Sequence, residues 1–410
     1  MMRSTTTRTR LAVTVLAFVL CATIWHWRHA AHGRTTTPPR SEWREATYPP
    51  GERATVDCAT GFTLEYHPGY KIIRVLYPWR NARTSFTYVL IPRGAKRPPM
   101  PKGAVLVETP VRRVVLASTT YVPYFLTFGL TDRIVGMSGA HGAYSPVIGQ
   151  LIQRGHIAEV SNGNGMARDY NMERLAAIQP DLVITYGTGL AQYDRQDQLE
   201  QAGFNVAIDA EYMEQTPLGQ TEWMKFIAAF FDKDAEAERQ FAQIMRNYKA
   251  EVALTTRVKN RPTVFCNASY KGVWYVPGGK SWPAAFLRDA GATYLWRDDP
   301  TVGSVPLNIE AVIERAKNAD IWLEPGECRS LPELAAIDSR YSMFRAFRSG
   351  QVYNNNARVS ARGANDIWET GVARPDRVLG DLISIIHPEL VPGHKRVWYR
   401  QLSATAQAAQ

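Results

Sequence analysis

Residues 217–256 form a long stretch without a strand-like run, and short apolar strands alternate with helical segments on either side of it. Such alternation is typical of a parallel sheet covered by helices on both faces. Within the stretch, an apolar side chain recurs at spacings of four, three and four residues, at Phe241, Met245, Tyr248 and Val252. This spacing places one apolar stripe along a helix. The pattern therefore predicts an α/β fold of two Rossmann-like lobes with parallel sheets, joined by a long rigid helix.

The elements expected within the lobes are short. Strand-like runs cover residues 114–117, 134–137, 181–185, 205–208, 263–266, 320–323 and 351–353. Helical patterns cover residues 171–178, 281–290, 308–317, 340–348 and 375–386. Ahead of them, three strand-like runs and a turn at His67-Pro68-Gly69 predict a small β-rich lead-in.

Seven segments describe the expected organisation. A chain of 410 residues is too long for a single ordinary hydrophobic core, so two domains or lobes are expected. A content of 45% hydrophobic and 21% charged residues indicates a folded protein. The segments are a signal peptide or N-terminal anchor (1–31), a linker (32–53), the β-rich lead-in packed on the first lobe (54–110), an N-terminal α/β lobe (111–216), the connecting helix (217–258), a C-terminal α/β lobe (259–400) and a tail (401–410).

The first 31 residues have the composition of an export signal. Three arginines and no acid precede an apolar run from Leu11 to Trp25. The run is short for a transmembrane helix, which needs about 20 residues, and suits a secretory signal. Cys21 would allow lipidation, but the bulky Leu20 stands where lipoprotein signals have a small residue. Cleavage, lipidation and an uncleaved anchor stay open, and all predict an exported, periplasmic protein.

Charge and cysteine content narrow the function classes. The net charge is +10, but lysines and arginines beyond the N-terminus are scattered, so no nucleic-acid partner is expected. Cys58, Cys266 and Cys328 lack the spacing of zinc ligands. Cys266 ends one expected strand and Cys328 follows another, so a disulfide between them is a hypothesis.

No catalytic motif is complete. Gly278-Gly279-Lys280-Ser281 resembles the end of a phosphate-binding loop, but Trp274 occupies the position that must be the first glycine. The histidines are dispersed and no G-x-S-x-G elbow occurs. The sequence therefore predicts a protein that is not an enzyme and has no metal or cofactor of its own, although haem ligation by Tyr or His stays open.

Five segments, taken in order, resemble the periplasmic binding proteins of iron-siderophore and cobalamin ABC importers. They are RRVVLASTTYVPYFLTFGLTDRIVGM (112–137), NMERLAAIQPDLVITYG (171–187), WYVPGGKSWPAAFLRDAGATYLW (274–296), VPLNIEAVIERAKNADIWLEPG (305–326) and QVYNNNARV (351–359) with IWETGVARPDRVLGDLISIIHPEL (367–390). The resemblance implies a monomer that captures a metal chelate between its lobes and delivers it to an inner-membrane ABC permease. The favoured chelate is a ferric siderophore. Cobalamin or haem as ligand, and a ligand-free interaction or sensor protein, are the alternatives.

The resemblance also implies where ligand and permease bind. In open parallel sheets, ligands lie beyond the carboxyl ends of the strands, where aromatic rings give apolar walls and arginines bind anionic oxygens. The candidate ligand contacts are Thr119, Thr120, Tyr121, Tyr144, Arg168, Tyr186, Tyr270, Trp274, Trp282, Arg358 and Trp368. For each aromatic residue, ordinary core packing stays open.

Family members dock arginines of the permease with one glutamate in each lobe, and Glu173 and Glu310 match these positions. Each follows an asparagine by two residues at the expected start of a helix. Acids near a helix N-terminus also complement the helix dipole without a partner, so a purely structural role stays open.

Overall fold

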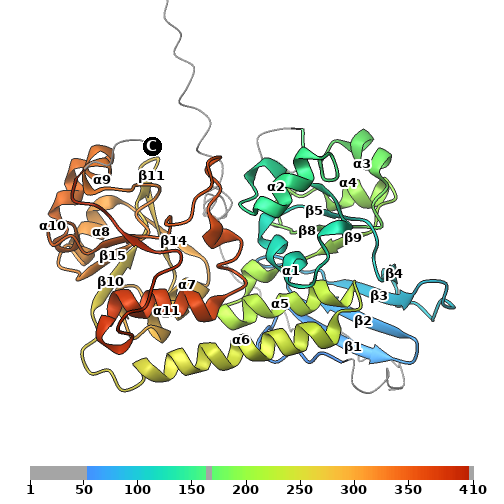
Figure 1. Cartoon of the computed structure of the whole chain (residues 1–410), viewed down its shortest axis with the longest axis horizontal. Coiled ribbons are helices and arrows are strands. Elements are labelled where there is room, and N and C mark those ends of the chain that lie inside the picture. The colour runs from blue at the N-terminus through green and yellow to red at the C-terminus, as the bar shows by residue number, and fades with distance from the viewer. Residues whose placement is uncertain (1–52, 163–168, 406–410) are drawn as a thin grey trace, which may run out of the picture.

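The computed structural model describes residues 53–162 and 169–405. Two α/β lobes lie side by side over a layer of long helices, and a small sheet extends beside the N-terminal lobe (Figure 1). The predicted fold class is confirmed. The predicted export signal (1–31), nearly all of the predicted linker (32–53) and the candidate ligand contact Arg168 lie outside the described residues.

The N-terminal lobe contains a five-stranded sheet in the order β7-β6-β5-β8-β9, with every neighbouring pair parallel. The strands β5, β8 and β9 are fully buried and rich in Val, Ile and Leu, as expected for a sheet covered on both faces. The strands are β5 (Val114–Leu116), β6 (Ile134–Met137), β7 (Ala158–Glu159), β8 (Leu182–Thr185) and β9 (Val206–Ile208).

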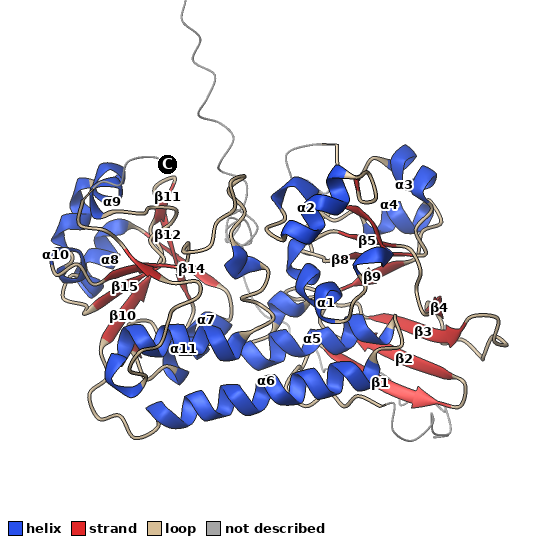
Figure 2. Cartoon of the chain, in the orientation of Figure 1, coloured by secondary structure: helices blue, strands red, loops and turns tan. Residues whose placement is uncertain are grey.

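Helices cover this sheet, as Figure 2 shows. Ser145 caps the second helix by accepting the Ile148 N–H, and Asn171 caps the third by accepting the Arg174 N–H at 2.9 Å. The helices are α1 (Val122–Thr127), α2 (Pro146–Gln153), α3 (Met172–Ile178) and α4 (Gln196–Gln201), with the 3₁₀ turn η2 (Thr119–Tyr121) after β5.

The C-terminal lobe repeats the arrangement. Its main sheet has the order β13-β10-β15-β16-β17, parallel except for the last pair, and a three-stranded antiparallel sheet β11-β12-β14 lies beside it. The strands are β10 (Thr263–Cys266), β11 (Ser269–Tyr270), β12 (Val273–Pro277), β13 (Thr293–Tyr294), β14 (Ser304–Leu307), β15 (Ile321–Leu323), β16 (Val352–Asn354) and β17 (Arg400–Gln401). The helices are α7 (Trp282–Asp289), α8 (Ile309–Ala316), α9 (Leu331–Ile337), α10 (Arg345–Arg348) and α11 (Pro375–Ile386).

The stretch predicted as one connecting helix (217–258) forms two helices, α5 (Pro217–Ala229) and α6 (Asp234–Thr255). Between them Asp232 has φ +55°, a left-handed conformation that interrupts the helix. The 22-residue α6 packs on α5 and on α11 of the other lobe, and Asn247 of α6 donates to Asp376 at 3.1 Å. The link between the lobes is therefore a layer of packed helices.

The lead-in forms a four-stranded sheet in sequence order, β1 (Phe62–His67), β2 (Tyr70–Val75), β3 (Phe86–Pro92) and β4 (Val105–Thr109). The first three strands are antiparallel, and β4 is parallel to β3. Phe62, Ile73 and Tyr88 belong to the same core as the N-terminal lobe. The Tyr88 hydroxyl accepts the Ile208 N–H at 2.9 Å, so the lead-in is bonded directly to β9.

Two buried carboxylates hold the start of the lead-in. Glu222 of α5 accepts the N–H groups of Cys58 and Ala59 at 2.6 and 2.7 Å. Glu214 accepts the N–H of Gly61 at 2.8 Å. Lys225, fully buried, pairs with Glu222 at 2.9 Å. Backbone donors that would otherwise lose water on burial are thus satisfied by charged acceptors.

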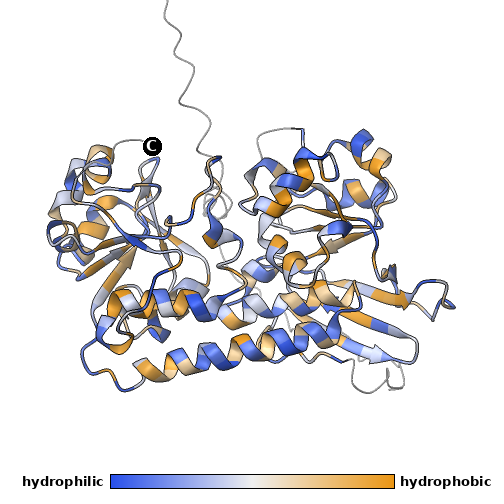
Figure 3. Cartoon of the chain, in the orientation of Figure 1, coloured by the Kyte–Doolittle hydropathy of each residue, from blue (hydrophilic) through white to orange (hydrophobic). Residues whose placement is uncertain are grey.

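The buried core of each lobe is built around its sheet, and hydrophobic residues concentrate along the strands of both lobes (Figure 3). Cys266 and Cys328 are both buried and free, so the hypothesised disulfide between them is absent. Burial raises the pKa of the Cys266 thiol well above its ordinary value. No described helix is long and apolar enough to cross a membrane.

Candidate functional site

The carboxyl ends of three parallel strands in the C-terminal lobe meet at one pocket. Cys266 ends β10, Glu324 follows β15 and Asn355 follows β16, and all three line it. Pro217 and Gln220 of α5 close the pocket from the interlobe layer. Its volume is about 50 Å³, enough for ordered water but not for a whole ligand.

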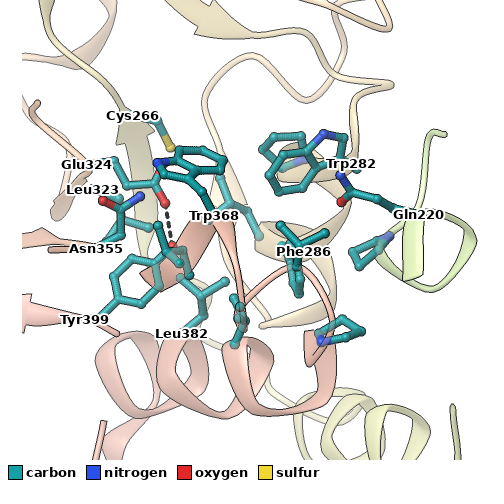
Figure 4. A pocket seen from close by; sticks show the side chains of 18 residues that line it. Gln220, Cys266, Trp282, Phe286, Leu323, Glu324, Asn355, Trp368, Leu382 and Tyr399 are labelled. Atoms are coloured by element: carbon teal, nitrogen blue, oxygen red, sulfur yellow. Dashed lines mark hydrogen bonds between the residues drawn. The ribbon is translucent and has the colours of Figure 1, made fainter. Parts of the chain in front are cut away.

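Two predicted ligand contacts, Trp282 and Trp368, come together at this pocket. Figure 4 shows both indoles beside it, with the hydrogen bond from Tyr399 to Glu324 next to Trp368. Glu324 has φ +58° and is half-buried, and burial raises its pKa. The pocket thus combines flat apolar walls with a carboxyl group in its lining.

Glu369 joins the two lobes through hydrogen bonds. The Glu369 carboxylate, in the C-terminal lobe, accepts the N–H of Tyr144 and, at 3.1 Å, the N–H of Ser145 in the N-terminal lobe. Arg358 lies over the Tyr144 ring at 5.5 Å and pairs with the buried Asp366 at 2.8 Å. The predicted contacts Tyr144 and Arg358 are therefore brought together.

A larger cavity of about 410 Å³ opens between α1, α5 and α6 on one side and the segment 370–377 of the C-terminal lobe on the other. Arg358, Arg374 and Arg377 line it, and no acid is among its described lining residues. Two of these arginines are paired with aspartates, Arg358 with Asp366 and Arg374 with Asp376. The cavity falls within the usual size of small-molecule pockets, about 300–1,000 Å³.

The predicted contacts after β5 divide into two groups. Thr119 and Thr120 are partly exposed, and the Thr120 hydroxyl donates to Glu211 at 3.0 Å. Tyr121 is fully buried in the lobe core and is corrected from a ligand contact to a core residue. The 3₁₀ turn points its ring inward because the next residues begin the apolar face of α1.

A buried acid pair lies behind Thr120. Asp209 and Glu211 follow β9 and are shielded from solvent, and the Glu211 N–H donates to Asp209 at 3.1 Å. Burial and mutual repulsion raise the pKa of Asp209 well above its ordinary value, and burial also raises that of Glu211. The hydroxyl of Thr120 connects this pair to the partly exposed turn after β5.

The remaining aromatic predictions separate by burial. Tyr186 follows β8, is half-buried and lies 6.3 Å from the Tyr212 ring. Tyr270, in β11, is also half-buried. Trp274 is fully buried in the core and donates to the Cys266 carbonyl at 2.9 Å, so it is corrected to a core residue. It lies on β12 with its ring packed against Phe265 and Trp322.

Glu173 and Glu310 are exposed in the first turns of α3 and α8, each behind an asparagine cap. Glu310 pairs with Arg340 at 2.7 Å on the surface. Both carboxylates are therefore accessible to a partner, on helices in different lobes.

Sequence reasoning missed Glu324, Asn355 and Glu369. Glu324 directly follows one predicted strand and Asn355 lies two residues after another, so the rule that placed Tyr186 in the site could have found them. Glu369 reaches its partners across more than two hundred residues, and no local signal marks such a contact. Among the described residues, no group of three or more His, Cys, Asp or Glu side chains is placed to hold a metal ion.

Comparison with known proteins places this geometry in context. Residues 114–357 match the family model described as periplasmic binding protein. An uncharacterised lipoprotein of Methanocaldococcus jannaschii is 28% identical over 302 residues, covering 71% of this chain and 68% of the relative. A vitamin B12-binding protein of Vibrio parahaemolyticus is 25% identical over 211 residues, covering 51% and 70%.

Solved structures share the fold. CeuE of Helicobacter pylori, solved as a Ni-His complex, matches with a TM-score of 0.52 at 19% identity over 70% of this chain and 86% of that one. The periplasmic haem-binding protein RhuT of Roseiflexus matches with a TM-score of 0.51 at 19% identity over 68% and 99%.

Proposed function

This chain belongs to the periplasmic binding protein family, and on that premise we propose that it captures a metal chelate, a ferric siderophore first, between its lobes and delivers it to an ABC importer permease. The resemblance seen in the sequence is thereby confirmed at the level of the family, whose members are substrate-binding proteins. The ligand and the delivery step are the proposal.

One observation carries the choice of an anionic chelate. Three arginines line the 410 Å³ interlobe cavity without an acid among its described lining residues. Guanidinium groups bind carboxylate and other anionic oxygens in two-pronged fashion, and the paired aspartates hold two of them in place. Arg377 is exposed and keeps its charge available to a ligand.

Cobalamin or haem is the second candidate ligand. The half-buried indoles Trp282 and Trp368 at the neighbouring pocket give flat apolar walls, which suit a macrocycle. Relatives and structural neighbours named for vitamin B12 and haem binding support the same choice.

The proposed place of action is outside the cytoplasmic membrane. The basic and apolar N-terminal segment supports export, and a relative named as a lipoprotein supports anchoring. A monomer docked to an inner-membrane permease completes the proposal.

Native mass spectrometry of the purified chain tests the function. The protein is examined as isolated and then with ferric siderophores, cobalamins and haem. A one-to-one adduct with saturable tryptophan quenching is expected for one chelate. If that chelate is anionic, Arg377→Ala should weaken its binding at least about tenfold. Arg154→Ala, an exposed arginine at the end of α2, is the matched control. Absence of any adduct across the panel would move the function to the ligand-free interaction protein.

A further inference from the structure

The loop between β2 and β3 lies outside the matched family segment 114–357 and rests on the N-terminal lobe. Its Trp79 ring packs on Gly187 and Gly189, which follow β8. A Cβ on Gly187 would lie 2.3 Å from the ring, and one on Gly189 would lie 2.6 Å from it. The Tyr212 hydroxyl holds the loop that follows β8 in place by donating to the Gly187 carbonyl at 2.6 Å. Trp79 is therefore seated on the strand-end loop that carries Tyr186.

A tight turn follows Trp79. The Ala82 N–H donates to the Trp79 carbonyl at 3.2 Å, so Arg80 and Asn81 are its two central residues. Asn81 has φ +59°, a conformation that asparagine tolerates better than most residues. Arg80 is exposed at the tip and forms no ion pair with the described residues.

Arg80 reaches the other lobe. Its Nη1 lies 3.7 Å from the position that a Cβ on Gly303 would occupy, just before β14. The Gly303 carbonyl accepts the Gly278 N–H at 2.8 Å, and Gly278 stands four residues before Trp282. An unpaired guanidinium from the lead-in thus lies against the turn that leads into the Trp282 pocket.

We propose that the turn Tyr77–Ala82 is a third wall of the ligand cleft, supplied by the lead-in, and that Arg80 binds an anionic group of the ligand. This inference rests on the proposed function and narrows its ligand to negatively charged chelates. Arg80 stands on one lobe and approaches the other, so it completes the site only when the lobes are close together. Trp79 supplies the rigid base, which lowers the entropy lost when the turn binds ligand.

The test compares Arg80→Gln with Arg83→Gln. Both residues are exposed and lie three positions apart in the connection between β2 and β3, and each change removes one positive charge. Tryptophan quenching gives dissociation constants for the anionic chelates ferric citrate and a ferric tris-catecholate, and for the uncharged hydroxamate ferrichrome. We expect Arg80→Gln to raise the dissociation constant for an anionic chelate about tenfold or more and to leave that for ferrichrome unchanged. Arg83→Gln should match the wild type.

The outcomes separate the two proposals. If the wild-type chain binds an anionic chelate and Arg80→Gln binds it equally well, the third wall is overturned and the proposed function stands. An equal loss in both arginine variants also overturns it, because net charge alone would then explain the effect. If the wild-type chain binds no chelate, both proposals fail. Equal thermal unfolding midpoints for the three proteins establish that folding is intact.

Discussion

Glu369 is the residue whose charge most directly concerns the contact between the lobes. Its carboxylate accepts two N–H groups at the start of α2, where the helix dipole favours a negative charge. Burial is the stronger influence and, with nearby Asp366, raises the pKa of Glu369 from 4.5 to about 7. The site that joins the lobes therefore contains a carboxyl group that titrates near neutral pH.

The sign of the resulting pH dependence follows from the raised pKa. Stability due to the neutral form is fully present below pH 4.5 and is lost as the pH rises through about 7, by roughly 3 kcal/mol at most. Glu369→Gln removes this titration. Between pH 5 and 8 the unfolding temperature of the wild type should fall relative to that of the variant. Glu314→Gln, on the exposed side of α8, should keep the wild-type profile, and parallel profiles for Glu369→Gln would contradict the assignment.

Gly187 is predicted to tolerate no side chain. An added Cβ would lie 2.3 Å from the Trp79 ring, so Gly187→Ala must displace the indole. We expect a loss of about 1–3 kcal/mol in the free energy of unfolding, measured by urea titration. Gly142→Ala is the control, because nothing lies within 4 Å of its added Cβ. Equal stability of the two variants would show that Trp79 is not held in this cradle.

At the level of single residues, sequence patterns predicted position better than orientation. Thr120, Tyr144 and Trp368 were expected in strand-end loops and lie there, but Trp274 is a core residue. A tryptophan beside a Gly-Gly turn has the same local sequence whether its ring faces the cleft or the core. Only the packing of β12 against Phe265 and Trp322 decides between them.

Among the elements, α5 has a role that its sequence does not announce. It is almost entirely buried, and its Glu222 and Lys225 lie where an apolar helix would be expected. These charges are satisfied by each other and by the backbone at the start of the lead-in, so α5 is one of the elements to which the lead-in is bonded.

Glu222→Gln should loosen the lead-in. The change breaks a buried ion pair and weakens the acceptor for the Cys58 and Ala59 N–H groups. Removing one partner of a buried pair costs about 3–5 kcal/mol, although Glu238 still pairs with Lys225 at 2.9 Å. Hydrogen exchange should accelerate at residues 57–61 before the rest of the chain. Glu236→Gln, which pairs with Lys233 near the surface, is the control, and unchanged exchange in Glu222→Gln would contradict this role.

The elements of the two main sheets were largely predictable, because short buried strands are unbroken apolar runs. The sheet β11-β12-β14 was not predicted, since its strands contain Pro277 and Pro306 and lack regular alternation. The break between α5 and α6 was also missed. Its signal is the polar pair Asp232 and Lys233, which is ordinary on the surface of a continuous helix.

Across the whole molecule, the two lobes repeat one topology. In each lobe the first strand pairs with the strand that follows a capped helix, β5 with β8 after α3 and β10 with β15 after α8. Glu173 and Glu310 therefore occupy equivalent positions in the two lobes, which supports the proposed docking of a two-part permease.

Glu173→Ala combined with Glu310→Ala should abolish chelate uptake by cells and leave the dissociation constant for the chelate unchanged. The surface pair of Glu310 with Arg340 is weak enough to be exchanged for a permease arginine. Glu314→Ala, also exposed on α8, should keep full uptake. Wild-type uptake by the double variant would remove the docking role.

Closure of the lobes is expected to be small. The layer of α5, α6 and α11 packs across the join, and bending it would disturb buried contacts in both lobes. Small-angle scattering with and without ligand should show only a slight change in radius of gyration. Marked compaction on ligand addition would contradict a rigid joint.

The first described residues lie against α6 near its start, beside the N-terminal lobe. Thr55 donates its N–H to Glu238 of α6 at 2.9 Å, and Ala54 donates to the Tyr66 hydroxyl at 2.7 Å. A tether attached upstream of these residues would therefore hold the molecule through the lead-in and the start of α6. Tension on such a tether would act on α6 and the lead-in beside the N-terminal lobe and would put no direct load on the C-terminal lobe.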